Sequence, residues 1–201
     1  MLEADLFINF DSYYIVAVCY LIGSIPFGLL ISKLLKRNDP RLHGSKNIGA
    51  TNILRTSGWK LGLLTLIFDI LKGYFPIIIL KNFDLSLNIF ILFIFLGHLF
   101  PIWIKFKGGK GIAVIIGCLI AYNFQYGIFF MSTWLLVASI TRYSSLAALI
   151  SSLCTLLLFY IKSDDLFSAM IIIVLMIFYK HFSNIKRLLG GKESKIILKN
   201  K

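Results

Sequence analysis

The chain has 201 residues, of which 58% are hydrophobic and 15% are charged, and its formal net charge is +12. This composition excludes an ordinary soluble domain, because its apolar runs are long enough to cross a bilayer. On such a chain a net positive charge indicates the orientation in the membrane and contact with anionic lipid headgroups. The interleaved basic and aromatic residues of a nucleic-acid-binding surface are absent. We therefore expect an integral membrane protein that contacts membrane lipids and does not bind nucleic acid.

Seven apolar segments follow one another along the chain, at residues 13–36, 60–81, 87–104, 111–124, 126–141, 144–161 and 166–180. Each is predicted to be a helix, because a backbone in lipid must satisfy its own hydrogen bonds. The fourth and fifth fall below the roughly 20 residues that a crossing helix needs, so they are expected to tilt, to thin the bilayer or to form a re-entrant hairpin. The prediction is an all-α, polytopic membrane helical bundle with about seven transmembrane helices, in one domain over residues 1–201.

The distribution of charge predicts the orientation of the bundle. With the N-terminus outside, 18 of the 21 basic residues fall on the inner side, whereas six of the nine acidic residues fall outside. Merging the fourth and fifth segments into one span would send the basic C-terminal segment outside, which argues for two separate segments. The positive-inside rule therefore predicts an outside N-terminus and a cytoplasmic C-terminus.

Residues 104–113 interrupt the apolar pattern with three lysines and three glycines. Glycines let the backbone curl so that N–H groups point inward, the helix that follows adds its positive N-terminal end, and the lysines add full charges. This is not a Walker A loop, because Gly111 rather than Ser or Thr follows Lys110, so nucleotide hydrolysis is not implied. A basic turn that binds only lipid headgroups is the alternative. The residues expected to cradle a phosphate are Lys107, Gly108, Gly109, Lys110 and Gly111.

Two further polar segments, residues 43–55 and 180–193, fall on the same predicted side of the membrane. Both are rich in hydrogen-bond donors and poor in acidic residues. We expect these two segments and the lysine-glycine segment to be loops that converge on one interfacial layer and form an anion pocket there.

Six blocks of sequence resemble the acyl-phosphate-dependent glycerol-3-phosphate acyltransferases of bacterial inner membranes, the PlsY family. The blocks are residues 23–28, 44–52, 69–73, 97–101, 106–111 and 184–188, and they cover nearly the whole chain in order. In the first block, Gly23, Pro26 and Gly28 predict close packing and a kink. The chain departs from the family's usual pattern at Lys46, where a glycine is usual, and at Phe182, where an arginine is usual.

The resemblance implies transfer of a fatty acyl group from acyl-phosphate to the 1-hydroxyl of glycerol 3-phosphate, giving lysophosphatidic acid and phosphate in the first acylation of phospholipid biosynthesis. It implies a multi-pass enzyme of the bacterial inner membrane whose active site faces the cytoplasm. An HxxxxD motif requires an Asp five residues after a histidine, and none of the three histidines has one. Acyl-phosphate is already activated, so positioning and charge neutralisation are expected to supply most of the rate.

No cofactor or metal is expected, because lysine, arginine and backbone donors can neutralise the phosphates, although a loosely held Mg²⁺ remains an alternative. Ser45 and Arg55, with Asn47 and Asn52, are expected to hold glycerol 3-phosphate or the developing oxyanion, since arginine offers a bidentate fork to phosphate. Ser45 as a helix cap is the alternative. Ser45 as a covalent nucleophile would need a neighbouring base, and none is evident locally.

His181 and Asn184 lie three residues apart and therefore share a face if the helix continues. This spacing suits a histidine that orients or deprotonates the acceptor hydroxyl while the asparagine fixes it. A histidine that only interacts with the helix dipole is the alternative. Ser45, Arg55, His181 and Asn184 are thus the catalytic candidates.

Four residues are expected to support the site. Asp69 and Lys72 lie at i and i+3 within a membrane helix, where both are costly unless they pair or line a cavity. His98 is expected to shape the entry to the phosphate loop, and Glu193 to brace the basic C-terminal segment. Two rival classes are a transporter of phosphorylated solutes, which usually shows paired repeats and broken helices near the midplane, and a structural subunit, which needs no lysine-glycine loop.

Overall fold

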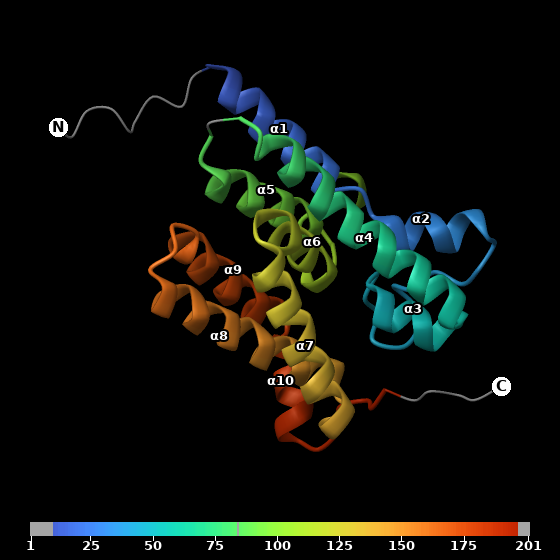
Figure 1. Ribbon diagram of the computed structural model, residues 1–201. Coiled ribbons are helices and arrows are strands. Elements are labelled where there is room, and N and C mark those ends of the chain that lie inside the picture. Colours follow the sequence, from blue (N-terminus) through green and yellow to red (C-terminus); the bar gives the residue numbers. More distant parts are fainter. Residues whose placement is uncertain (1–9, 84, 197–201) are drawn as a thin grey trace.

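The computed structural model describes residues 10–83 and 85–196, and every regular element within these ranges is helical (Figure 1). The elements are α1 (Phe10–Gly23), α2 (Phe27–Leu34), α3 (Ala50–Ser57), α4 (Trp59–Leu80), α5 (Leu87–Leu99), the 3₁₀ helix η1 (Ile102–Ile104), α6 (Ile112–Tyr122), α7 (Phe124–Thr141), α8 (Ser144–Lys162), α9 (Phe167–Lys180) and α10 (Phe182–Leu189). The all-α prediction is confirmed.

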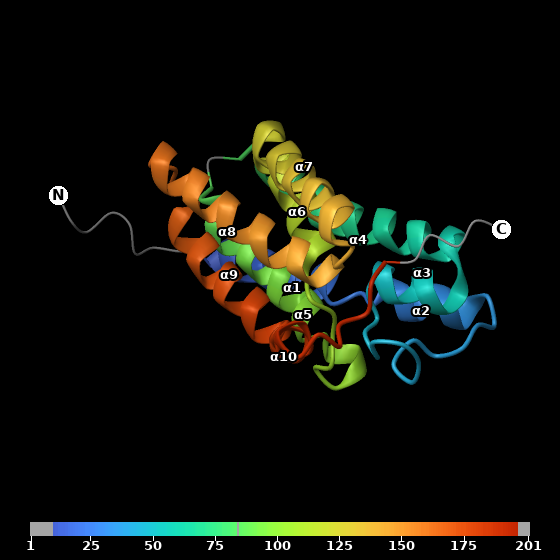
Figure 2. The same ribbon diagram turned by 90° about the horizontal axis from the view of Figure 1, so that it is seen from below.

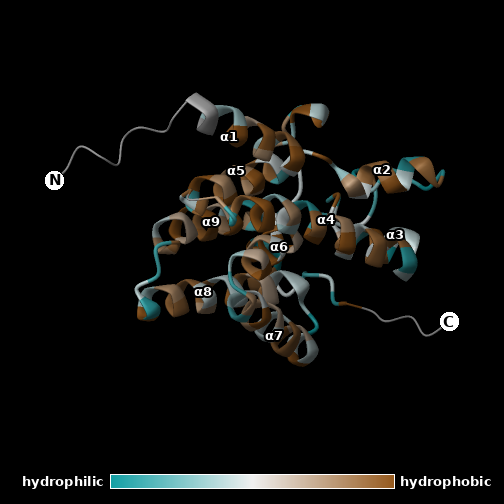
Figure 3. Cartoon of the chain, turned by 45° about the horizontal axis from the view of Figure 1, so that its top comes forward, coloured by the Kyte–Doolittle hydropathy of each residue, from teal (hydrophilic) through white to brown (hydrophobic). Residues whose placement is uncertain are grey.

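Four stretches of the described residues are long and apolar enough to cross a bilayer, namely Trp59–Leu80, Leu87–Ile104, Phe124–Thr141 and Ser144–Lys162. Two bent pairs, α1 with α2 and α9 with α10, raise this number to six if each pair is one broken span. The remaining predicted segment, the fourth, is α6, which has only 11 residues. Figure 3 shows apolar residues along these helices and hydrophilic residues in many of the connecting segments.

The fifth predicted segment is longer in the structure than its apolar run. Helix α7 begins at Phe124 and has 18 residues, because the side chain of Asn123 accepts a hydrogen bond from the N–H of Gln125 and caps the helix. The first turn contains polar residues, so hydropathy alone did not assign it to this helix. The fourth segment remains short, as predicted.

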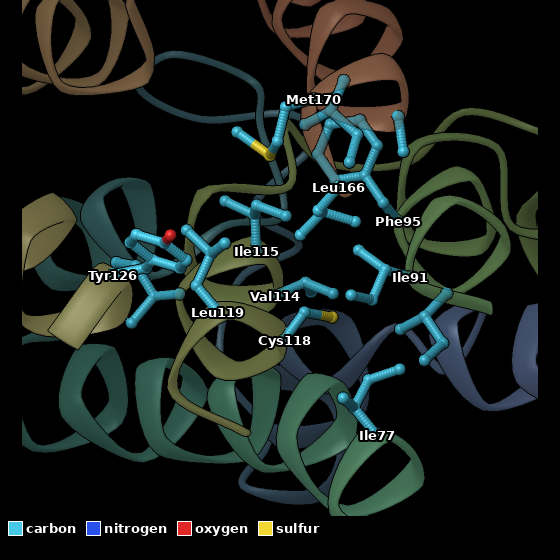
Figure 4. Close-up of a cluster of buried hydrophobic side chains, with 14 of the residues drawn as sticks. Ile77, Ile91, Phe95, Val114, Ile115, Cys118, Leu119, Tyr126, Leu166 and Met170 are labelled. Atoms are coloured by element: carbon cyan, nitrogen blue, oxygen red, sulfur yellow. The ribbon is translucent and has the colours of Figure 1, made fainter. Parts of the chain in front are cut away.

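Helix α6 lies at the centre of the bundle, where it packs against α4, α5 and α7 (Figure 1). A Cβ atom on Gly73 of α4 would lie 2.3 Å from the carbonyl oxygen of Val114, so the two backbones touch there. Small residues allow this approach between membrane helices. Figure 4 shows Val114, Cys118 and Ile115 of α6 surrounded by apolar side chains of neighbouring helices.

The predicted kink in the first segment is present. The chain leaves helical geometry between α1 and α2, and the two helices meet at an angle of 44°. Pro26 lacks the N–H that a continuous helix would use. The Nζ atom of Lys72 donates to the carbonyl oxygen of Ile25 at 2.7 Å, so the break is held from α4.

Two segments that were expected to be loops contain short helices, α3 and α10. Their apolar residues recur at helical spacing but form no long apolar run, which is why hydropathy did not reveal them. Ile53 of α3 is fully buried, and Ile185 and Leu188 of α10 pack against the core. These short helices fix the direction of the polar side chains that they carry.

The end of the bundle at the C-terminus of α4 is closed by paired polar groups. The hydroxyls of Tyr122 and Tyr126 donate to the two carboxylate oxygens of Asp164 at 2.7 and 2.9 Å. The Nζ atom of Lys81 donates to the carbonyl oxygen of Tyr122 at 2.8 Å. The other end, where α3 leads into α4, carries the polar segments.

Candidate active site

A cavity of about 490 Å³ lies where the polar segments meet the apolar helices. This volume is within the range of small-molecule sites. Its polar wall includes Ser45, Asn47, Asn52, Arg55, Asp69, His98, Lys110, Ser145, His181, Asn184 and Glu193. Its apolar wall, from α4, α6, α7 and α8, includes Leu66, Ile70, Ile112, Ile116, Met131, Trp134 and Ala148. The predicted convergence of three distant segments on one pocket is therefore present in the fold.

Lys110 stands in this wall immediately before α6, and its Nζ atom donates to Oδ1 of Asn184. Burial lowers the pKa of Lys110 to about 8, against the opposing charge of Glu193, and the positive charges of Arg187, Arg55 and Lys180 lower it further. The charged form of such a partly desolvated ammonium group is stabilised when an anion binds beside it.

Glu193 fixes the amide of Asn184 in one orientation. Its Oε1 atom accepts from Nδ2 of Asn184 at 2.7 Å and from Oγ of Ser145 at 2.9 Å, and its Oε2 atom accepts from Nε of Arg187 at 2.7 Å. Burial alone would raise the pKa of Glu193, but the hydrogen bonds from Asn184, Arg187 and Ser145 outweigh it and hold the pKa below its ordinary value. The amide oxygen of Asn184 is thereby directed to Lys110.

His181 lies between α9 and α10 and is buried, with 3% of its surface exposed. Its Nδ1 atom is 2.8 Å from the carbonyl oxygen of Ile177. A carbonyl oxygen can only accept, so Nδ1 carries the hydrogen, and in the neutral ring Nε2 keeps its lone pair. The ring can therefore accept a proton or a hydrogen bond at Nε2.

Asn52 organises the segment before α3. Its Oδ1 atom accepts the N–H of Ser45 at 2.8 Å, and its Nδ2 atom donates to the carbonyl oxygens of Pro40 and Asn47 at 2.9 and 2.8 Å. The amide expected to bind substrate is thus occupied by the loop itself. The N-cap of α3 is Gly49, so the alternative in which Ser45 caps a helix is wrong.

Arg55 reaches the cavity from α3. One terminal nitrogen, Nη2, donates to the carbonyl oxygen of Ser194 at 2.9 Å, and this contact joins α3 to the segment after α10 (Figure 2). Its Nε atom is buried and has no hydrogen-bond partner among the described residues. Burial also lowers the pKa of Arg55. A guanidinium with a spare buried donor is suited to a phosphate oxygen.

The lysine-glycine segment differs in detail from the predicted cradle. The N–H of Gly108 donates to the carbonyl oxygen of Leu99 at 3.2 Å, and that of Gly109 to the carbonyl oxygen of His98 at 3.1 Å. The expectation that these two N–H groups point at an anion is wrong, because they close the turn onto the end of α5. Gly109 instead permits close packing, since a Cβ there would lie 2.1 Å from Nε2 of His98.

The part of this segment that faces the cavity is its last part. Lys110, Gly111 and the first residues of α6 line the cavity. The first N–H groups of a helix have no partner within it, and they carry the positive end of the dipole. Lys107 does not line the cavity. It lines a second hollow that adjoins the cavity.

Asp69, Lys72 and His98 form a buried cluster at the edge of the cavity, which Asp69 and His98 line. The Nζ atom of Lys72 is 2.7 Å from Oδ1 of Asp69, and Nδ1 of His98 is 3.8 Å from the same oxygen. The predicted pairing of Asp69 with Lys72 is present. Because Lys72 also bonds to Ile25, the cluster joins the α1–α2 break, α4 and the end of α5.

Ser145 was missed by the sequence reasoning, although it lines the cavity and donates to Glu193. It is the second residue of α8, three residues after Arg142 on the predicted inner side, and that position was the available signal. The segment after α10 was also missed as a wall, although Ile196 lines the cavity and its N–H donates to the carbonyl oxygen of Arg142. Within residues 10–83 and 85–196, no three His, Cys, Asp or Glu side chains are grouped as a metal site would require.

The fold and the cavity define a multi-pass, all-helical membrane protein with a site suited to an anionic, partly apolar ligand. Residues 13–191 match the family model described as Glycerol-3-phosphate acyltransferase. The chain is 46% identical over 208 residues to a Glycerol-3-phosphate acyltransferase of Bartonella henselae, an alignment that covers 100% of this chain and 99% of that protein. The chain belongs to the glycerol-3-phosphate acyltransferase family, which confirms the resemblance seen in the sequence.

Two solved structures have the same fold. One is a crystal structure of PlsY, an integral membrane glycerol 3-phosphate acyltransferase, in its glycerol 3-phosphate form, with a TM-score of 0.88 and 37% identity. The other is PlsY in its lysophosphatidic acid form, with a TM-score of 0.85 and 36% identity. Each alignment covers 92% of this chain and 95% of the other chain.

Proposed function

We propose that this protein transfers a fatty acyl group from acyl-phosphate to the 1-hydroxyl of glycerol 3-phosphate, giving lysophosphatidic acid and inorganic phosphate. The observation that carries the proposal is the cavity itself, whose wall joins cationic donors to apolar side chains of four helices. Membership in the glycerol-3-phosphate acyltransferase family supports it. A lipid donor and a water-soluble acceptor need such a combination in one space.

The acyl chain of the donor lies along the apolar wall, against residues such as Ile70, Ile116 and Trp134. Its phosphate then meets Lys110 and the N-terminus of α6. Both stabilise a dianion, the lysine by its charge and the helix end by its free N–H groups. The carbonyl carbon of the donor lies between these two parts, next to the polar wall.

The acceptor binds between α3 and α10. Arg55 offers its spare Nε donor to the phosphate of glycerol 3-phosphate, and Asn184 and Ser45 hold its glycerol part. Because Glu193 and Lys110 already fix the Asn184 amide, this group needs little reorganisation when the acceptor arrives. Preorganised donors of this kind are worth more in a water-poor site than in water.

The 1-hydroxyl oxygen attacks the acyl carbonyl carbon, and the bond from that carbon to the phosphate oxygen breaks. The proton of the hydroxyl passes to Nε2 of His181, and the electron pair of the broken bond leaves with the phosphate. Lys110 and the N-terminus of α6 neutralise the charge that develops on the leaving group. The cluster of Asp69, Lys72 and His98 holds α4, α5 and the lysine-glycine segment in fixed relative positions.

The protein resides in the bacterial inner membrane with the cavity open to the cytoplasm. The charge asymmetry of the sequence supports this orientation, since 18 of the 21 basic residues fall on the predicted inner side, which is also the side of the polar segments around the cavity. An impermeant maleimide applied to intact cells distinguishes the two sides. A cysteine in place of Lys192 is expected to stay unlabelled until the cells are opened, whereas one in place of Asn82 is labelled at once.

The reaction is tested with purified protein in a neutral detergent. Palmitoyl phosphate with glycerol 3-phosphate is expected to release phosphate and form lysophosphatidic acid in equal amounts, as measured by a phosphate assay and mass spectrometry. Palmitoyl-coenzyme A serves as the control donor and should give no product. Phosphate release that does not depend on the acceptor, or that yields no lysophosphatidic acid, would contradict the proposed function.

A further inference from the structure

A second hollow, of about 710 Å³, opens beside the cavity. We call it the outer vestibule. Its walls come from residues 41–48, 106–110 and 179–183, together with Phe100. Five cationic side chains line it, and no acidic residue is among its lining residues: Arg41, Lys46, Lys107, Lys110 and Lys180. One of the five, Arg41, forms an ion pair with Asp39 at 2.6 Å, so the positive charge of the vestibule comes from its four lysines.

The charge of the outer vestibule differs from that of the cavity. The cavity wall contains the cations Arg55 and Lys110 and two carboxylates, Asp69 and Glu193. Attraction of an anion from water depends on the summed charge near the opening, because low-dielectric walls focus the field there. The outer vestibule, whose lining has no carboxylate, therefore attracts an anion more strongly than the cavity does.

Two residues of the vestibule wall have backbone conformations that favour glycine. Lys46 has φ of 58° and Phe106 has φ of 61°. A lysine at such a position is strained, and strain of this kind persists where the surrounding structure or a function maintains it. Lys46 is exposed and forms no ion pair or side-chain hydrogen bond within the described part of the chain. Its ammonium group is thus available to a ligand.

The outer vestibule and the cavity share part of one wall. Ser45, Asn47 and Lys110 line both spaces. An anion in the outer vestibule consequently lies beside Lys110, the lysine proposed to bind the donor's phosphate. The other vestibule lysine with a fixed position, Lys180, is held by the carbonyl oxygen of Leu99 at 2.9 Å.

We propose that the outer vestibule is a second phosphate site, which takes up phosphate groups from water before they reach Lys110 and through which free phosphate leaves. This proposal rests on the proposed function and extends it. The chemistry recognised is a phosphate dianion, carried either by glycerol 3-phosphate on its way in or by inorganic phosphate on its way out. Lys46 is a rim residue of this site and does not touch the reacting atoms.

Lys46→Gly tests the proposal, because it removes the charge and relieves the backbone strain, so the fold is retained. The matched control is Lys36→Gly, which removes an exposed lysine with φ of 51° that does not line the vestibule. Initial rates are measured in neutral detergent against glycerol 3-phosphate, at several salt concentrations and with added inorganic phosphate. Lys46→Gly is expected to raise KM for glycerol 3-phosphate, or the inhibition constant of phosphate, by about fivefold, with kcat within about twofold.

The arms of the experiment separate the two sources of phosphate. A rise in KM alone assigns the vestibule to entry of the acceptor, a rise in the inhibition constant alone assigns it to exit of the product, and a rise in both assigns it to both. In each supporting case the salt dependence of the affected constant weakens, and KM for palmitoyl phosphate stays unchanged. Lys36→Gly is expected to match the wild type throughout.

Three outcomes would overturn the proposal. Lys46→Gly could match the wild type in both constants, Lys36→Gly could shift them equally, or the effect of Lys46→Gly could occur only in vesicles that contain phosphatidylglycerol, which would assign the lysine to lipid headgroups. Calorimetric titration of inorganic phosphate adds a measurement without turnover, with weaker binding expected for Lys46→Gly only. Failure of the proposed function is distinct, because then the wild type itself forms no lysophosphatidic acid.

Discussion

The two ends of the bundle treat their polar groups in opposite ways. At the end that follows α4, both carboxylate oxygens of Asp164 accept hydrogen bonds from tyrosine hydroxyls, and Oδ1 also accepts the N–H of Leu166. At the cavity end, Nε of Arg55 and Nδ1 of His98 are buried without a partner among the described residues. Lys110 is held there with a pKa of about 8.

Buried polar groups are usually paired, so a group left incomplete calls for a reason. At the closed end, pairing contributes to the stability of the bundle. At the cavity end, incomplete pairing leaves donors that a phosphate can satisfy, at a cost in stability that is common at functional sites. The same kinds of side chain thus serve structure at one end and, in the proposed function, ligand binding at the other.

The largest expected effect tests this contrast on one lysine from each end. Lys110→Gln removes a charged donor from the cavity and is expected to lower kcat/KM for palmitoyl phosphate by at least about 100-fold. Lys81→Gln, at the closed end, is the control and is expected to change kcat/KM by less than about twofold. Similar losses in the two variants, measured by phosphate release, would break the contrast.

A smaller effect is expected when the charge is kept and the shape is changed. Arg55→Lys retains a cation but loses the planar fork, so KM for glycerol 3-phosphate is expected to rise about tenfold. Arg37→Lys, on an arginine that does not line the cavity, serves as the control. An unchanged KM in Arg55→Lys would remove this arginine from the acceptor site.

The dependence on pH sharpens the role of Lys110. The group is charged below its pKa of about 8 and neutral above it, so kcat/KM is expected to fall as pH rises through 8, by up to about tenfold per pH unit. Lys110→Arg stays charged across this range, and its remaining activity should lose that decline. A decline that persists unchanged in Lys110→Arg would assign it to another group.

The smallest effect is expected at the closed end. Asp164→Asn keeps the shape but weakens the bonds from Tyr122 and Tyr126, which is expected to cost about 1–2 kcal/mol of stability. The apparent unfolding temperature should fall by about 3–6 °C. KM for both substrates should stay at the wild-type value, and a changed KM would show that the two ends are coupled.

The sequence predicted the long helices and the kink well, because apolar runs and Pro26 act locally. It did not reveal the short helices α3 and α10, whose residues are helical mainly through their tertiary packing. The hydrogen bonds from Gly108 and Gly109 to the end of α5 were equally hidden, since their partners lie about ten residues away across a turn.

Site residues divide in the same way. Four candidate residues could be selected by residue type alone, and all four line the cavity: Arg55, Lys110, His181 and Asn184. The use of Asn52 by its own loop and the separation of Lys107 from Lys110 depend on backbone geometry, which composition and spacing do not specify.

The shortness of α6 has a consequence for the fate of the donor. Helix α6 ends beside Lys81, just past α4, yet at 1.5 Å per residue its 11 residues extend only about 16 Å, half the length of α4. Its first turn therefore starts level with the middle of α4, near Asp69, which lines the same cavity. An acyl-phosphate anchored there is recessed from bulk water, so spontaneous hydrolysis of its anhydride bond is suppressed until an alcohol arrives.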